Sequence, residues 1–134
     1  MPNTQAGLQQ AGFYTNIVRG QHLIEASLVG LWNVDVLARF EAEVERAVQV
    51  LSLSGTPPGN ALLLLDARNH GVQPSVVVEG FQEMACKLIG KVKRTAAIVD
   101  STLQALQAKR VTGTLHYRVF TSDDAARAWL TGGL

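Results

Sequence analysis

The sequence predicts an α/β domain in which helices cover both faces of a mainly parallel sheet. Two apolar runs carry this prediction. Residues 61–65 (Ala-Leu-Leu-Leu-Leu) follow the breaker run 55–60 and end at Asp66, and residues 95–99 end at Asp100. Short, continuous apolar runs are typical of strands that are buried on both faces. Helical patterns alternate with these strands, and that alternation favours parallel pairing through right-handed crossovers.

The start of the chain predicts a tail followed by a hairpin. Residues 1–12 are polar and lack periodicity, so we expect a flexible N-terminal tail before a single domain at 13–134. Residues 13–19 and 22–28 favour strands and are separated by Gly20-Gln21. Two strands around a two-residue, glycine-containing turn predict a hairpin, which adds one antiparallel edge strand.

Two amphipathic helices are predicted next. Asn33 or Asp35 can cap the first helix. Its apolar residues recur at steps of three and four: Leu37, Phe40, Val44, Ala47, Val48 and Leu51. Ser75 is the predicted N-cap of the second helix, which runs to about Ile89 and buries Val77, Phe81, Met84 and Leu88.

The remaining elements follow from capping signals. Ser101 and Gln104 have the spacing of a capping box, so a third helix is expected up to about residue 110. Residues 115–120 form the last predicted strand, and Ser122 opens a final helix. The predicted order is β-β-α-β-α-β-α-β-α, with a five-stranded sheet and four helices.

Composition excludes several classes of protein. A chain of 134 residues fits one domain, and a net charge of +1 argues against general binding of nucleic acid. The basic run Lys87, Lys91, Lys93 and Arg94 is explained by a solvated helix end, and the alternative is a surface for an acidic partner. No apolar run is long enough to span a membrane and no leader is visible, so a cytoplasmic protein is expected.

The sequence shows no site for a metal or cofactor. The single cysteine, Cys86, rules out an internal disulfide and lies in an apolar pattern, so a buried or half-buried position is expected. His22, His70 and His116 lack the spacing of metal ligands. Glycine-rich phosphate loops and the nucleophile elbow of hydrolases are also absent, so neither a metal nor a cofactor is expected.

The order of elements and three strings resemble the STAS domain family, and in particular its SpoIIAA-like branch of small bacterial proteins. The strings are Ala61-Leu-Leu-Leu-Leu-Asp66, Arg94-Thr-Ala-Ala-Ile-Val-Asp100, and Tyr117-Arg-Val-Phe-Thr-Ser-Asp-Asp-Ala-Ala-Arg-Ala-Trp129. The resemblance runs over roughly residues 14–131. It implies a non-enzymatic module that binds another protein through the loop and helix after the central strand.

The resemblance also suggests a switch. Anti-sigma-factor antagonists of the family carry Asp-Ser-Ser-Gly at this loop, and a kinase phosphorylates a serine there. Of that motif only Ser75 is present here, without the acidic residue and the glycine, so helix capping is the predicted role of Ser75 and phosphorylation is the alternative. A phosphate at a helix N-terminus adds about two negative charges and changes which surface can dock there.

Two other functions stay open. Asp66, Arg68, His70 and Asp100 at the carboxyl edge of the strands could form a hydrolase-like site in which Asp66 orients His70. Val76 and Val78 lie off the apolar stripe of the second helix and predict an exposed contact surface. That surface could serve a protein partner, a small apolar, lipid-like ligand as in the CRAL-TRIO domains grouped with this branch, or a second copy of the chain.

Overall fold

The computed structural model describes residues 11–111 and 116–132. Its elements are β1 (Gly12–Val18), β2 (Leu23–Val29), α1 (Val34–Leu53), β3 (Ala61–Asn69), α2 (Ser75–Leu88), β4 (Val92–Ile98), α3 (Thr102–Arg110), β5 (Tyr117–Phe120) and α4 (Asp123–Gly132). The five strands form one sheet in the order β1-β2-β3-β4-β5. β1 is antiparallel to β2 and the other neighbours are parallel, which confirms the predicted fold class.

The two apolar runs lie side by side at the centre of the sheet. β3 and β4 are parallel, with Leu64 opposite Ala96 and Leu65 opposite Ala97. All four side chains are buried. The prediction of two parallel strands with helices over them is therefore confirmed.

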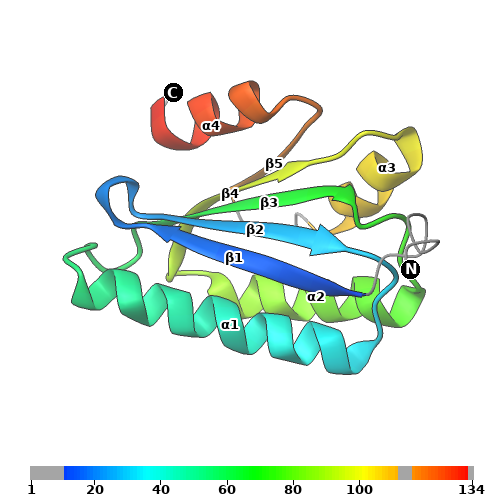
Figure 1. The fold of residues 1–134 in the computed structure, drawn as a ribbon, viewed down its shortest axis with the longest axis horizontal. Helices are drawn as coiled ribbons and strands as arrows, with labels where there is room; N and C mark the ends of the chain where they lie inside the picture. Colours follow the sequence, from blue (N-terminus) through cyan, green and yellow to red (C-terminus); the bar gives the residue numbers. More distant parts are fainter. Residues whose placement is uncertain (1–10, 112–115, 133–134) are drawn as a thin grey trace, which may run out of the picture.

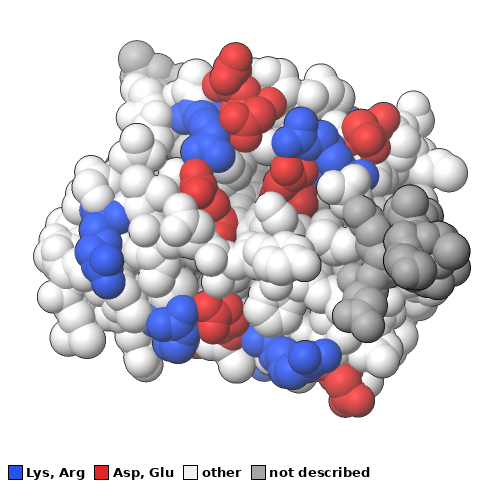
Figure 2. Space-filling view, viewed as in Figure 1, with Lys and Arg blue, Asp and Glu red and all other residues white. Residues whose placement is uncertain are grey.

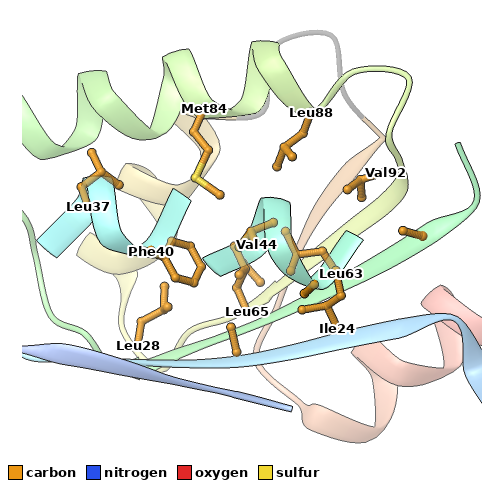
Figure 3. Close-up of a cluster of buried hydrophobic side chains, with 14 of the residues drawn as sticks. Ile24, Leu28, Leu37, Phe40, Val44, Leu63, Leu65, Met84, Leu88 and Val92 are labelled. Carbon is orange, nitrogen blue, oxygen red and sulfur yellow. The ribbon is translucent and has the colours of Figure 1, made fainter. Parts of the chain in front are cut away.

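Successive side chains of β3 point to opposite faces of the sheet. Leu63 and Leu65 belong to a core that also contains buried residues of α1 and α2, whereas Leu62 and Leu64 pack with α4. Figure 1 shows α1 and α2 together below the sheet, α4 above it, and α3 beside the ends of β4 and β5. A close-up of the larger core shows Phe40 and Val44 of α1 near Met84 and Leu88 of α2 (Figure 3).

Three predicted helix caps are present. The side-chain oxygens of Asn33, Ser101 and Ser122 accept hydrogen bonds from the backbone N–H of the third residue of α1, α3 and α4, at 3.0, 3.1 and 3.2 Å. Each cap provides a partner for an N–H group that has none within the helix. Gln104, the second member of the capping box, accepts from the N–H of Asp100.

Several predicted details are wrong. The hairpin is joined by four residues, 19–22, rather than two, and includes a short 3-10 turn at Arg19–Gln21; His22 has a positive φ of 57°. Cys86 is exposed, because it lies on the outer side of α2 and not on its packed face. The predicted strand start at residue 115 and most of the predicted tail at 1–12 lie outside the described residues.

Residues of the basic run lie on different faces of the sheet. Lys87 of α2 and Lys91, which follows that helix, form ion pairs with Glu41 and Glu45 of α1, at 3.0 and 2.9 Å. Arg94 turns to the other face of the sheet, where it donates to the carbonyl of Trp129. On the face shown in Figure 2, blue side chains lie next to red ones in several places. Of the described helices, none is long and apolar enough to cross a membrane.

A candidate binding surface at the carboxyl edge of the sheet

Gln73 ties together three segments at the carboxyl edge of the sheet. Its side-chain oxygen accepts from the N–H of Trp32 at 2.8 Å, and its amide nitrogen donates to the carbonyls of Gly30 and His70. Its backbone exchanges two hydrogen bonds with the side chain of Gln107 in α3, at 2.8 and 2.6 Å. We call Gln73 and Gln107 the glutamine bracket. The bracket fixes the β2–α1 loop, the β3–α2 loop and α3 relative to one another.

A second tie lies close by. The amide nitrogen of Gln104 donates to the carbonyls of Ala67 and Arg68 at 3.2 and 3.4 Å, while its oxygen accepts from the N–H of Asp100 at 2.9 Å. Gln104 therefore joins the start of α3 to the end of β3. Both Gln73 and Gln104 are buried, so their hydrogen bonds are shielded from water.

Exposed apolar side chains lie on the segments that the bracket joins. They come from the β2–α1 loop and the start of α1, from the β3–α2 loop and the start of α2, and from α3. We call them the apolar rim: Leu31, Val34, Val72, Val76, Leu103 and Leu106. Each is at least 46% exposed, and Leu31 reaches 66%. Single exposed apolar residues are common, but six on segments tied together at one edge indicate a contact surface.

The predicted residues of α2 have different positions. Val76 is 53% exposed and belongs to the rim, whereas Val78 is 8% exposed and packs inward, so the prediction that both are exposed is wrong for Val78. Ser75 is exposed, but it is the first residue of α2 and not its N-cap. Pro74 occupies the cap position without a side-chain hydrogen bond. The hydroxyl of Ser75 is thus left accessible next to Val76.

Asp66 and Arg68 form a local ion pair on the other face of the sheet. The guanidinium of Arg68 donates to both carboxylate oxygens of Asp66, at 2.9 and 2.7 Å. These hydrogen bonds lower the pKa of Asp66, against the opposing effect of burial. Asp66 also borders a hollow beside Asp123 and Arg127 of α4, and exposed Asp100 interacts electrostatically with Arg68.

His70 is separated from Asp66. Its ring packs against Trp32 and Phe81, at centroid distances of 4.6 and 5.8 Å, on the side of the sheet that α1 and α2 cover. Burial lowers the pKa of His70 to about 4. The predicted Asp66–His70 pair, in which the carboxylate would orient the imidazole as a general base, is therefore not formed.

A small cavity lies behind the bracket. It is bounded by β3, β4, β5, α2 and α3, has a volume of about 70 Å³ and opens to solvent. Small side chains create the space, since Ala67, Ala97 and Ala108 all lie on its wall. Val78 and His70 also line it. Among the described residues, no group of three or more His, Cys, Asp or Glu side chains is arranged to hold a metal ion.

The predicted site residues thus divide between different places. Val76 and Ser75 lie at the apolar rim, Asp66 and Arg68 lie on the face of α4, and His70 and Val78 line the cavity. Sequence reasoning missed the glutamine bracket and most of the rim. One signal was available for α3, where Leu103 and Leu106 are spaced three apart and therefore share a helix face.

Comparisons with known proteins support the fold. No family model matches the chain, and no curated protein does. A solved structure of an uncharacterized DUF3478-family protein with a SpoIIAA-like fold, from Shewanella loihica, is similar with a TM-score of 0.68 and 17% identity, over 91% of this chain and 96% of that chain. An anti-sigma factor antagonist from Mycobacterium paratuberculosis has a TM-score of 0.60 and 14% identity, over 89% and 94% of the two chains. At these identities the likeness shows the fold.

Proposed function

From the SpoIIAA-like fold of this chain, we propose that it is a non-enzymatic binding module that docks a protein partner on the apolar rim. The observation that carries the proposal is that six exposed apolar side chains lie on segments held by the glutamine bracket. A surface that is fixed before binding loses less conformational entropy when a partner docks. The fold it shares with an anti-sigma factor antagonist also supports a protein as the partner.

Ser75 is the proposed control point of this surface. It is exposed, it begins α2, and its neighbour Val76 belongs to the rim. A phosphate here would be stabilised by the N-terminus of α2, so the helix would persist while the rim gained about two negative charges. Docking of an apolar partner surface should then weaken without unfolding of the domain.

Binding assays with matched variants test the proposal. Immobilised wild-type protein is used to isolate a partner from its source cells, and the affinity of that partner is then measured by calorimetry. We expect Val76→Glu and Leu106→Glu each to weaken binding at least tenfold, because a charge is placed in an apolar contact. Leu53→Glu is the control, since Leu53 is 90% exposed but lies at the far end of α1. Equal loss in all three variants, or in none, would reject the rim as the docking site.

Ser75→Asp tests the control point separately. We expect weaker partner binding together with an unchanged or slightly raised melting temperature, because an acid suits the first turn of a helix. Binding at wild-type affinity would remove Ser75 from the proposal while leaving the rim in place.

The other hypotheses stand as follows. A second copy of the chain is an alternative occupant of the rim, and light scattering of wild type and Val76→Glu decides between a dimer and a separate partner. Carriage of a lipid-like ligand stays a prediction. The cavity behind the bracket, at about 70 Å³, is well below the roughly 300–1,000 Å³ of typical ligand sites, whereas a hollow of about 300 Å³ between α1 and the loops at 56–59 and 90–91 reaches the lower end of that range. The hydrolase hypothesis required Asp66 and His70 to meet, and they lie on different sides of the sheet.

A further inference from the structure

The two edge strands of the sheet, β1 and β5, differ in how they are protected (Figure 1). β5 has four residues and carries the charged side chain of Arg118. β1 has seven residues, Gly-Phe-Tyr-Thr-Asn-Ile-Val, with neither a charge nor a proline. It pairs with β2 over its whole length without a register shift, so no bulge interrupts it. Soluble proteins usually protect an edge strand by shortness, charges, prolines or bulges, and β1 has none of these protections.

The backbone groups on the open side of β1 follow from the register. The N–H of Leu62 in β3 donates to the carbonyl of His22, the residue before β2. Successive residues of a strand bond to alternate sides, so the even-numbered residues of β2 face β3 and the odd-numbered ones face β1. Their partners in β1 are residues 12, 14, 16 and 18. The N–H and C=O groups of Phe13, Thr15 and Ile17 therefore point away from the sheet, and within the described part of the chain they have no hydrogen-bond partner.

β1 is complementary to a second β1 strand in the antiparallel orientation. With Thr15 opposite Thr15 of a second copy, Phe13 lies opposite Ile17 and Tyr14 lies opposite Asn16. The three outward residues of each strand can then form six hydrogen bonds between the two strands. Aromatic side chains opposite β-branched ones, and threonine opposite threonine, are favourable cross-strand pairs, and no like charges meet. A contact in which the same residues face each other is what a two-fold dimer requires.

Helix α1 adds charge complementarity to this contact. It packs against both β1 and β2. Joining two β1 strands would therefore place the two copies of α1 about 10 Å apart, which is a usual distance for packed helices. The carboxylate of Glu43 on α1 accepts from the hydroxyl of Thr15 at 2.8 Å and from the guanidinium of Arg46 at 2.6 Å. Because Thr15 would lie on the two-fold axis, each Glu43–Arg46 pair would face the same pair of the other copy, with a positive group available to each carboxylate.

We propose that the chain forms a two-fold dimer through β1, in which the two sheets join into one continuous sheet. The occupant of the edge is a second copy of this chain, because the sequence of β1 satisfies its own register and the charges of α1 complement themselves across the axis. The dimer does not depend on the apolar rim, so either proposal can fail without the other.

Analytical ultracentrifugation of the full chain measures the dimer. We expect a mass of twice the 14.4 kDa of one chain, which falls to the single-chain mass on dilution. Thr15→Pro removes an outward N–H, a change that an edge strand tolerates because this N–H makes no bond to β2. It eliminates two of the six bonds between the strands and should raise the dissociation constant at least tenfold. Thr15→Val is the matched control, since it loses the hydroxyl but keeps the N–H, and it should dimerise as wild type does.

Cysteine variants test the register without relying on a change in affinity. In a Cys86→Ser background, Thr15→Cys places two thiols opposite each other, where Cα atoms about 5.5 Å apart suit a disulfide. Gly12→Cys has room for its side chain but sets the two thiols six positions, or about 20 Å, apart, so it should not crosslink. A chain that stays monomeric at millimolar concentration, or equal crosslinking of both variants, would overturn the proposal. A dimer that persists in Thr15→Pro would also overturn it, and dissociation of that dimer in Val76→Glu would place the second copy on the rim.

Discussion

Replacing Gln73 by alanine should destabilise the domain by about 2–4 kcal/mol. The side chain makes three hydrogen bonds to backbone groups of Gly30, Trp32 and His70, and it is buried. Each such bond contributes roughly 0.5–1.5 kcal/mol, and the buried N–H of Trp32 would also be left without its partner. The variant removes no large apolar group, so the loss measures the bracket and not the core.

Urea unfolding followed by tryptophan fluorescence gives this free energy, with the slope of the transition checked for two-state behaviour. Gln82→Ala is the matched control, because Gln82 is exposed and its side chain makes one hydrogen bond, to the carbonyl of Arg110. We expect the control to change stability by less than about 0.5 kcal/mol. A Gln73→Ala variant as stable as the control would show that the three segments are positioned by other contacts.

Three further outcomes are expected. Burial lowers the pKa of His70 from 6.5 to about 4, so the stability that its neutral form contributes is complete above pH 6.5 and is lost as the pH falls through 4. The loss in the free energy of unfolding is about 3 kcal/mol. His70→Phe should remove this dependence of the free energy of unfolding on pH, as measured by urea titrations at several pH values. The pKa of Asp66 is lowered chiefly by its hydrogen bonds with Arg68, so this pair stabilises the fold above the ordinary carboxyl range and weakens below it. Asp66→Asn should therefore lower the free energy of unfolding between pH 5 and 7, and should reduce its further decline below about pH 4, in urea titrations at several pH values. Gly80→Ala should lower the free energy of unfolding by about 1–2 kcal/mol in thermal or urea melts, because its Cβ would overlap with Leu37 of α1 and the cost of overpacking exceeds the helix preference for alanine; a stabilised variant would contradict this.

The sequence predicts those parts of the fold that depend on local pattern. The runs at 61–65 and 95–99 predicted the central strands, because a strand that is covered on both faces needs apolar residues in succession. Three helix starts were predicted from their capping residues Asn33, Ser101 and Ser122, because each side chain bonds to a backbone N–H only three residues further along the chain. Signals of this kind need no knowledge of the tertiary structure.

The candidate site depends on contacts between residues that are distant in the sequence, and local sequence patterns do not predict such contacts. Gln73 lies in a polar loop, and its partners Gly30 and Trp32 are about forty positions away, so no spacing marks it. Val78 is buried because α2 faces a cavity under α3 as well as the sheet, which makes its covered side wider than one stripe.

The position of His70 illustrates a third limit. In an unbroken strand, residues 66, 68 and 70 would share one face, because side chains alternate with a period of two. β3 ends at Asn69, however, and the N–H of His70 turns back to the carbonyl of Ala67 at 3.1 Å. The turn ends the alternation, and so His70 packs against Trp32 while Asp66 stays with α4.

The five strands lie in the sheet in the same order as in the chain. Every strand therefore finds its neighbour after a single hairpin or a single crossover, and none has to be inserted between two that have already paired. During synthesis the strands therefore leave the ribosome in the order in which they lie in the sheet, from the edge strand β1 to the edge strand β5 (Figure 1).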